Sequence, residues 1–205
     1  MTKALILVDI QNDFLPGGAL AVPDGDKVIP VANEMIEKFD LVFTTQDWHP
    51  ADHGSFASQH ADVAVGDMID LNGLTQIMWP DHCIQGTAGA EFAESLNLND
   101  AVRIFPKGTD PTIDSYSGFF DNGKRKATGL GDALKKAGVT HVFVLGLATD
   151  YCVKFTALDA KSLGFEVTLI EDGCRGVNLK PTDVADAIDE MRSAGIQITT
   201  SKEVV

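Results

Sequence analysis

The chain has 205 residues, of which 44% are hydrophobic and 22% are charged, and its formal net charge is −14. This composition is typical of a folded globular protein and argues against a fibrous or disordered chain. The negative charge repels phosphate backbones, so nucleic acid is not expected as a partner and a small or neutral substrate is favoured. The length fits a single α/β domain over residues 1–205.

Short apolar runs alternate with helical patterns along the chain. The runs are rich in Val, Ile, Leu and Phe and predict strands buried on both faces, at residues 3–9, 41–46, 101–105, 141–147, 166–170 and 196–199. Helices are predicted at residues 26–38, 130–137, 150–163 and 183–194. Thr149 and Thr182 stand at expected N-caps, and the last three helices end at Gly138, Gly164 and Gly195. The order predicts a doubly wound three-layer α/β/α sandwich with a mostly parallel six-stranded sheet.

A long insertion, about residues 47–100, separates the second and third predicted strands. It holds four of the five histidines and both tryptophans. Segments of this length inside a compact domain are usually either functional or disordered. Because disordered segments contain few aromatic residues, we expect this insertion to be functional.

Two observations bear on where the protein works. The first apolar run is too short and too soon interrupted by polar residues to be a signal peptide or a membrane span, so neither export nor a membrane partner is expected. The three cysteines, Cys83, Cys152 and Cys174, form no disulfide framework and predict free thiols in a reducing cytoplasm. The oligomeric state stays open, with a homo-oligomer as one alternative.

Three apolar runs lead to residues that can carry chemistry, namely Asp9, Lys107 and Cys152. The carboxyl ends of neighbouring parallel strands form the ligand crevice of such sheets, so these side chains can converge. Cys152 follows a strand at the start of a helix, where backbone N–H groups and the helix dipole favour the thiolate.

The structural alternative makes Cys152 a core residue and Asp9 with Lys107 a buried ion pair. A buried carboxylate without a partner is costly, and a buried ion pair seldom stabilises a fold more than apolar packing does. A catalytic triad accounts for all three residues with one site.

The insertion also carries a candidate metal site. Asp47 and His49 are two residues apart in an extended segment and face the same side, and His53 and His82 follow. Such a set suits Zn²⁺, Fe²⁺ or Mn²⁺. For the remaining histidines, His60 and His141, a surface role is preferred.

Aromatic residues are candidates for the walls of a substrate pocket beside these groups. They are Phe14, Trp79 and the segment Ser115–Phe120. For any one of them, a place in the core is the more common fate.

These residues stand in motifs that resemble the nicotinamidases, also called pyrazinamidases, of the isochorismatase-like cysteine hydrolases. The resemblance extends over essentially the whole chain, in Asp9–Phe14, Thr45–Pro50, Trp79–Thr87, Asp114–Asp121, Gly146–Cys152 and Asp172–Gly176. It implies an isochorismatase-like fold and hydrolysis of nicotinamide, and of pyrazinamide, to the acid and ammonia through a cysteine thioester. It further implies a place in NAD recycling.

The resemblance also implies roles for individual residues. Asp9, Lys107 and Cys152 are the implied triad, and the implied ligands of one divalent ion are Asp47, His49 and His82, with zinc preferred over iron or manganese. His53 or a water molecule completes the ion's coordination. The N–H groups of Ala148 and Cys152 form an oxyanion hole after a cis peptide at Leu147–Ala148. Phe14, Trp79 and Tyr151 contact the substrate.

Two other functions remain as alternatives. A different cysteine hydrolase of the same superfamily, acting on a vinyl ether or a ureido amide, would not need a metal that anchors a pyridine ring. A non-catalytic protein that binds a metal or another ligand would release no ammonia and would show no alkylation of Cys152.

Overall fold

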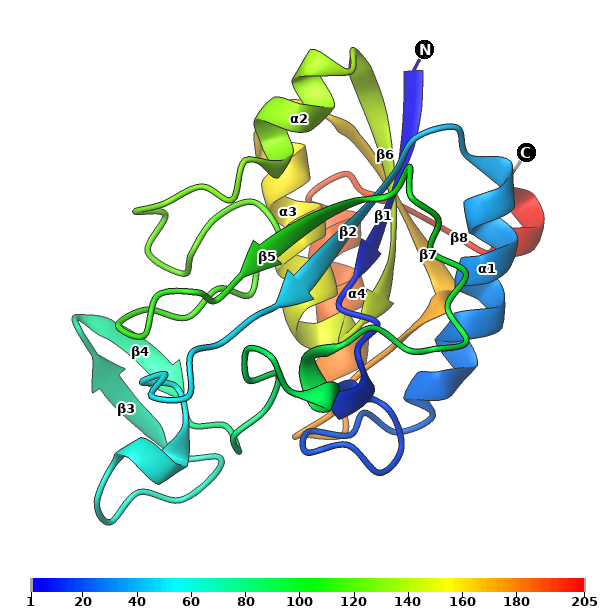
Figure 1. Ribbon diagram of the computed structural model, residues 1–205. Helices are drawn as coiled ribbons and strands as arrows, with labels where there is room; N and C mark the ends of the chain where they lie inside the picture. Colours follow the sequence, from blue (N-terminus) through cyan, green and yellow to red (C-terminus); the bar gives the residue numbers. More distant parts are fainter. Residues whose placement is uncertain (1, 205) are drawn as a thin grey trace.

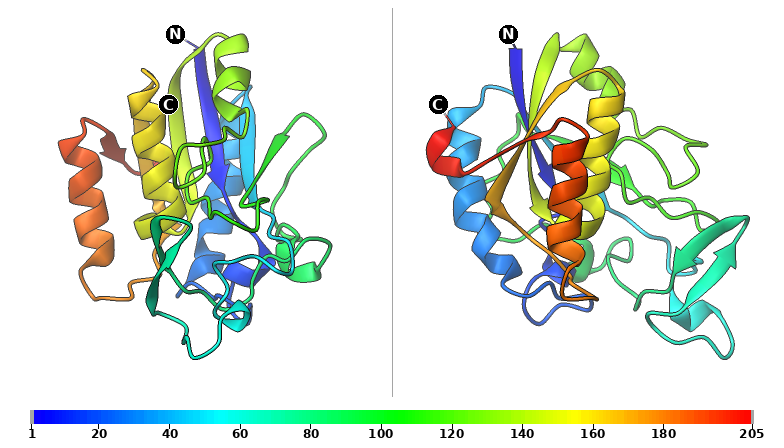
Figure 2. Two further views of the ribbon diagram at one scale, coloured as in Figure 1. Left: turned by 90° about the vertical axis from the view of Figure 1, so that its left-hand side faces the viewer. Right: turned by 180° about the vertical axis from the view of Figure 1, so that it is seen from behind.

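The computed structural model describes residues 2–204, in which six strands form one parallel sheet in the order β5-β2-β1-β6-β7-β8 (Figure 1). The strands are β1 (Thr2–Val8), β2 (Val42–Asp47), β5 (Arg103–Lys107), β6 (Val139–Leu147), β7 (Glu166–Arg175) and β8 (Gln197–Thr199). One face of the sheet is covered by α1 (Val28–Lys38), and the other by α2 (Leu130–Lys136), α3 (Lys154–Ser162) and α4 (Asp183–Ser193) (Figure 2). The predicted doubly wound α/β/α sandwich is therefore confirmed. None of the helices between residues 2 and 204 combines the length and the apolar character needed to cross a membrane.

The sheet has a topological switch point between β1 and β6. From β1 the chain builds the sheet outward through β2 and β5, then crosses back to β6 and builds in the opposite direction through β7 and β8. Open α/β sheets bind ligands at the carboxyl ends of the strands where this reversal occurs. The residues that follow β1 and β6 therefore flank the expected ligand crevice.

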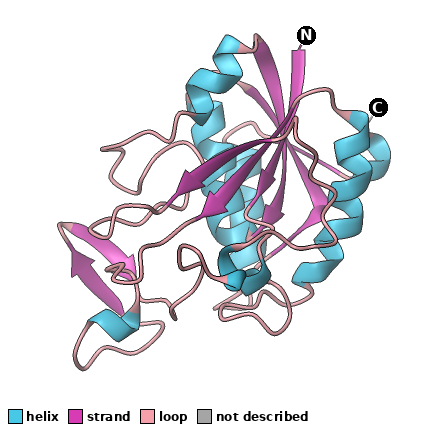
Figure 3. Cartoon of the chain, viewed as in Figure 1, coloured by secondary structure: helices cyan, strands magenta, loops and turns pink. Residues whose placement is uncertain are grey.

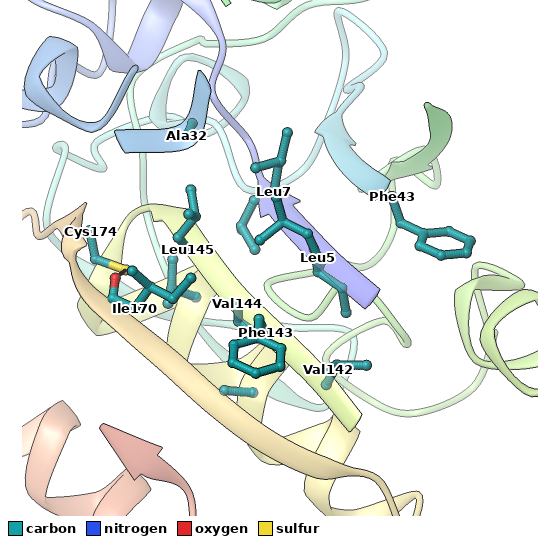
Figure 4. Close-up of a cluster of buried hydrophobic side chains, with 14 of the residues drawn as sticks. Leu5, Leu7, Ala32, Phe43, Val142, Phe143, Val144, Leu145, Ile170 and Cys174 are labelled. Carbon is teal, nitrogen blue, oxygen red and sulfur yellow. Dashed lines mark hydrogen bonds between the residues drawn. The ribbon is translucent and has the colours of Figure 1, made fainter. Parts of the chain in front are cut away.

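The central strands form the core because helices cover both of their faces. Figure 4 shows Leu5 and Leu7 of β1, Val144 and Leu145 of β6, and Ala32 of α1 in this cluster, and all five side chains are fully buried. Buried residues recur on α1 at helical spacing, namely Val28, Ile29, Ala32, Met35 and Ile36.

Some local predictions differ from the structure. The prediction that every strand is buried on both faces is wrong for the two edge strands. Ile104 of β5 is 49% exposed and no residue of β8 is buried, because β5 pairs only with β2 and β8 only with β7. Thr149 is not an N-cap, because it is the first residue of a π-helical turn, Thr149–Val153, that precedes α3 and has Ala148 as its N-cap. Thr182 is the N-cap of α4 but makes no side-chain cap hydrogen bond. The three predicted helix-ending glycines do adopt positive φ.

The insertion contains a feature that the sequence analysis did not predict, a two-stranded antiparallel hairpin of β3 (Met68–Leu71) and β4 (Leu74–Ile77). Asn72 and Gly73 join the two strands, both with positive φ, as a two-residue hairpin turn requires. The hairpin lies apart from the main sheet, beyond the carboxyl ends of the central strands, and loops connect it to the body (Figures 1 and 3).

The close approach of β1 and β6 requires a glycine at position 146 of β6. Its φ is +128°, and a Cβ atom there would overlap the backbone of Val8. Gly164 also has positive φ, +91°, but a Cβ there meets nothing within 4 Å. Gly146→Ala should therefore destabilise the protein by about 1–3 kcal/mol more than Gly164→Ala, measured by urea unfolding. Equal losses would show that β1 and β6 can move apart freely.

Candidate functional site

Asp9, Lys107 and Cys152 meet at the switch point as the sequence predicted. The Lys107 ammonium lies 3.0 Å from Asp9 Oδ2 and 3.3 Å from Cys152 Sγ. A carboxylate oxygen of Asp9 and the sulfur of Cys152 lie within 4.8 Å of each other. All three residues are buried.

Each of the three side chains comes from the carboxyl end of a different strand. Asp9 directly follows β1 with φ +48°, Lys107 ends β5, and Cys152 lies in the turn after β6. Thr45 of β2 donates a hydrogen bond of 2.6 Å to Asp9 Oδ1, and Lys107 donates one of 2.9 Å to the backbone oxygen of Ser115. These bonds fix the carboxylate and the ammonium in place.

The charges in this cluster determine which groups hold protons. Burial raises the pKa of Asp9, although Lys107 opposes the shift. Burial opposes the charge of Lys107, but Asp47, Asp9 and Cys152 together raise its pKa well above the usual value, so it stays an ammonium. Burial also raises the pKa of Cys152 well above the usual value, against the effect of Lys107.

These shifts correct one expectation from the sequence. The position of Cys152 at a helix start favours the thiolate, but burial beside the carboxylates of Asp9 and Asp47 favours the thiol more strongly. The resting residue is therefore a thiol that needs a base. Asp9, whose basicity is increased by the same burial, is the nearby group that can accept its proton.

Asp47, His49 and His82 form a second cluster beside the first, and all three are buried. The Nε2 atoms of His49 and His82 lie 3.7 and 3.9 Å from Asp47 Oδ2. Lys107 also contacts this carboxylate, at 2.5 Å from Oδ1. Asp47 therefore links the two clusters, with one oxygen on Lys107 and the other on the histidines.

The donor atoms of this cluster fit a divalent ion. His49 Nδ1 lies 2.8 Å from the Gly108 carbonyl and His82 Nδ1 lies 2.7 Å from the Pro80 carbonyl. A carbonyl only accepts, so each Nδ1 carries a proton and each Nε2, which faces Asp47, is the atom that can bind an ion. Burial lowers the pKa of His49 but Asp47 raises it more, so a bound ion would take the place of a proton on this Nε2. Burial and His49 lower the pKa of His82 to about 4, which keeps it neutral as a ligand must be. Burial alone would raise the pKa of Asp47, but Lys107 and His49 lower it.

His53 does not join that cluster. Its donor atom groups instead with those of His49 and Asp114. The His53 Nδ1 atom lies 2.7 Å from Ser55 Oγ, while Nε2 is buried without a hydrogen-bond partner. The predicted role of His53 as a ligand therefore stays a prediction.

Phe14, Trp79 and Tyr151 line one cavity that reaches both clusters, as expected, but of the segment Ser115–Phe120 only Tyr116 lines it. Cys152, Asp47 and His82 line it together with Phe14, Leu20, Trp79, Asp114, Tyr116, Ala148, Tyr151 and Val177. The peptide between Leu147 and Ala148 is cis, as the resemblance implied. Most of the lining is aromatic or aliphatic, and its acid, imidazole and thiol groups lie among these apolar residues, as in a site for a small-molecule ligand.

Other candidates lie outside this pocket. His60 and His141 are half-buried, bond to Gly54 and Thr168, and belong to no metal cluster found in residues 2–204. Phe119 is a core residue, 1% exposed. Cys83 and Cys174 are buried free thiols, as expected.

The sequence analysis missed residues that hold the site residues in place without lining the pocket. Gln11 is fully buried, and its side chain binds both backbone polar atoms of Asp47, accepting from N and donating to O at 2.8 Å each. The same amide donates to Ala90 O at 2.8 Å. The only sequence signal for this role is that Gln11 stands between the site residue Asp9 and the pocket residue Phe14.

Comparisons with known proteins agree with this geometry. Residues 3–203 match the family model described as the isochorismatase domain. A nicotinamidase of Escherichia coli is 52% identical over 202 residues, covering 97% of this chain and 94% of the relative. An Acinetobacter baumanii protein titled nicotinamidase and pyrazinamidase has a TM-score of 0.96 at 43% identity, covering 100% of this chain and 98% of the other. A pyrazinamidase of Pyrococcus horikoshii in complex with zinc has a TM-score of 0.81 at 42% identity, covering 98% and 99%.

Proposed function

The chain belongs to the isochorismatase family, and from this premise we propose that it is a nicotinamidase. The reaction is hydrolysis of the carboxamide of nicotinamide, and of pyrazinamide, to the acid and ammonia. The observation that carries the proposal is that Cys152, Lys107 and Asp9 lie beside Asp47, His49 and His82, next to a pocket lined mostly by aromatic and aliphatic residues. Relatives named nicotinamidase, which this chain matches over 94% and 98% of their own lengths, support it.

The chain's own residues supply the acyl-transfer chemistry. Asp9 takes the proton of the Cys152 thiol, and the sulfur forms a bond to the amide carbon while Lys107 offsets the negative charge. The N–H groups of Ala148 and Cys152 donate to the oxyanion. The C–N bond breaks as Asp9 returns the proton to the leaving nitrogen, which departs as ammonia.

A water molecule completes the reaction. Asp9 removes a proton from the water, the water oxygen adds to the thioester carbon, and the C–S bond breaks to release the acid. The proton held by Asp9 returns to the sulfur, so the cycle ends with the Cys152 thiol restored.

One divalent ion is part of the proposal, with Asp47, His49 and His82 as its ligands. When bound, the ion supplies a Lewis-acidic position that a pyridine nitrogen can occupy, which orients the ring. Zinc is the proposed metal because the donors are two imidazoles and a carboxylate, and because a similar pyrazinamidase is a zinc complex. Phe14, Trp79 and Tyr151, which line the pocket, pack against the ring of the substrate.

The proposal also covers the domain organisation, the metabolic role and the cellular compartment of the enzyme. Residues 1–205 are taken as one hydrolase domain with the insertion as its metal-binding part, and the reaction belongs to NAD recycling. Three free cysteines support a reducing cytoplasm.

The proposal is tested by ammonia release from nicotinamide, measured in parallel with wild type, Cys152→Ala and protein stripped of metal by a chelator. Activity should be lost in both altered samples and return to the stripped sample when zinc is added. Activity that persists in Cys152→Ala would refute the thioester mechanism. Activity that persists without metal would point to another cysteine hydrolase of the family.

A further inference from the structure

Gln76 occupies an unusual place in the β3–β4 hairpin. It is the single buried residue of the two strands, 3% exposed, while the other strand residues are exposed or half-buried. Glutamine is mostly found on protein surfaces, and a hairpin that covers a core would bury an apolar residue there. A buried amide in this position indicates that its hydrogen bonds are the reason for its burial.

The Gln76 amide bonds to two residues of the catalytic pocket. Its Nε2 lies within hydrogen-bond distance of three acceptors, 3.1 Å from Tyr116 Oη, 3.0 Å from Asp114 Oδ2 and 2.7 Å from the Ile77 carbonyl, and its two N–H groups are shared among them. Tyr116 and Asp114 line the pocket, whereas Gln76 does not. Gln76 therefore lies behind the wall and contacts the pocket only through other residues.

The same hydrogen bonds organise the aromatic wall. Tyr116 Oη accepts a second hydrogen bond from Trp79 Nε1 at 3.1 Å. The rings of Trp79 and Tyr151 meet edge to face with centroids 4.9 Å apart, and those of Tyr116 and Tyr151 are 5.5 Å apart. A shift of Tyr116 would therefore displace both neighbours.

We propose that Gln76 is a positioning residue that fixes the aromatic rings of Trp79, Tyr116 and Tyr151 relative to Asp114 and so selects a single planar ring. Tyr116 and Asp114 both line the pocket, and the Gln76 amide contacts both of them. The hairpin is thereby a specificity element of the site, although it lies outside the main sheet. This inference rests on the proposed nicotinamidase function.

Gln76→Met tests the inference because methionine keeps the length and burial of the side chain but removes both N–H donors. The KM for nicotinamide should rise roughly tenfold while kcat changes by less than about threefold, because the lost contact supports binding and not the reacting atoms. Quinoline-3-carboxamide presents the same nitrogen and carboxamide on a wider bicycle. The preference for nicotinamide over this analogue, in kcat/KM, should fall roughly tenfold.

Two further variants separate positioning from plain stability. Thr75→Ala changes the exposed neighbour of Gln76 on the same strand and should alter neither KM nor the preference. In a Tyr116→Phe background, Gln76→Met should have a clearly smaller effect on KM, since the two residues act through one hydrogen bond. If Gln76→Met does not fold, Gln76→Asn, which is too short to reach both partners, should give the same changes.

The outcomes are distinct. A wild type inactive on nicotinamide overturns the proposed function, and this inference with it. An active wild type with a folded Gln76→Met that keeps its KM and its preference overturns the inference alone. A fall in kcat and stability with an unchanged preference also overturns it, because that result describes a structural residue.

Discussion

Asp9→Asn is expected to lower kcat for ammonia release by at least about 10²–10⁴-fold, the usual contribution of a positioned acid or base. Asparagine has the size of aspartate and can keep the contact with Thr45, which donates to Asp9 Oδ1 at 2.6 Å. It cannot accept the Cys152 proton, and the thiol has a raised pKa and does not ionise unaided. Asp9 accepts a proton from the thiol in the first half-reaction and from water in the second, so the variant should slow both.

The matched control is Asp132→Asn, the same chemical change at an exposed position of α2. Steady-state ammonia assays should leave this control at the wild-type rate, and urea unfolding should show that Asp9→Asn is folded. A folded Asp9→Asn within tenfold of the wild-type kcat would mean that another group takes the proton, and the assignment of Asp9 as the base would fail.

The fold was predictable because its strands are simple in sequence. β1 and β6 are nearly continuous apolar runs, and only strands covered on both faces have that composition. Asp9 stood out because a carboxylate at the end of such a run needs a partner, and Lys107 is that partner. The triad could thus be inferred from the cost of burying charge before any contact was known.

The residues that position the site residues through hydrogen bonds were not predictable in the same way. Gln11 and Gln76 act through hydrogen bonds to residues 36 and 40 positions away, and no local pattern encodes such partners. The Asn72-Gly73 turn was a readable signal for the hairpin, but nothing in the sequence places that hairpin against the pocket. The pKa of Cys152 was misjudged because helix position is local, whereas burial and the carboxylates of Asp9 and Asp47, which raise this pKa, depend on the packed fold.

Lys107→Met is expected to destabilise the protein by about 3–5 kcal/mol at neutral pH, the usual result of removing one partner from a buried ionic group. The Lys107 ammonium is the charge that faces both Asp9 and Asp47, and all three residues are buried. Methionine fills similar space but leaves two carboxylates together without a cation. Activity should also be lost, since the charge beside Cys152 disappears.

The pH dependence distinguishes this electrostatic cause from poor packing. Lys107 lowers the pKa of both Asp9 and Asp47, so without it both folded-state pKa values rise. A carboxyl group with a raised folded pKa binds more protons in the folded state than in the unfolded state, so stability increases as pH falls. Urea unfolding of metal-free Lys107→Met should therefore show a smaller deficit, relative to wild type, at about pH 5 than at about pH 8. Lys136→Met on the exposed face of α2 should show almost no deficit at either pH, and an equal deficit for Lys107→Met at both would assign the loss to packing.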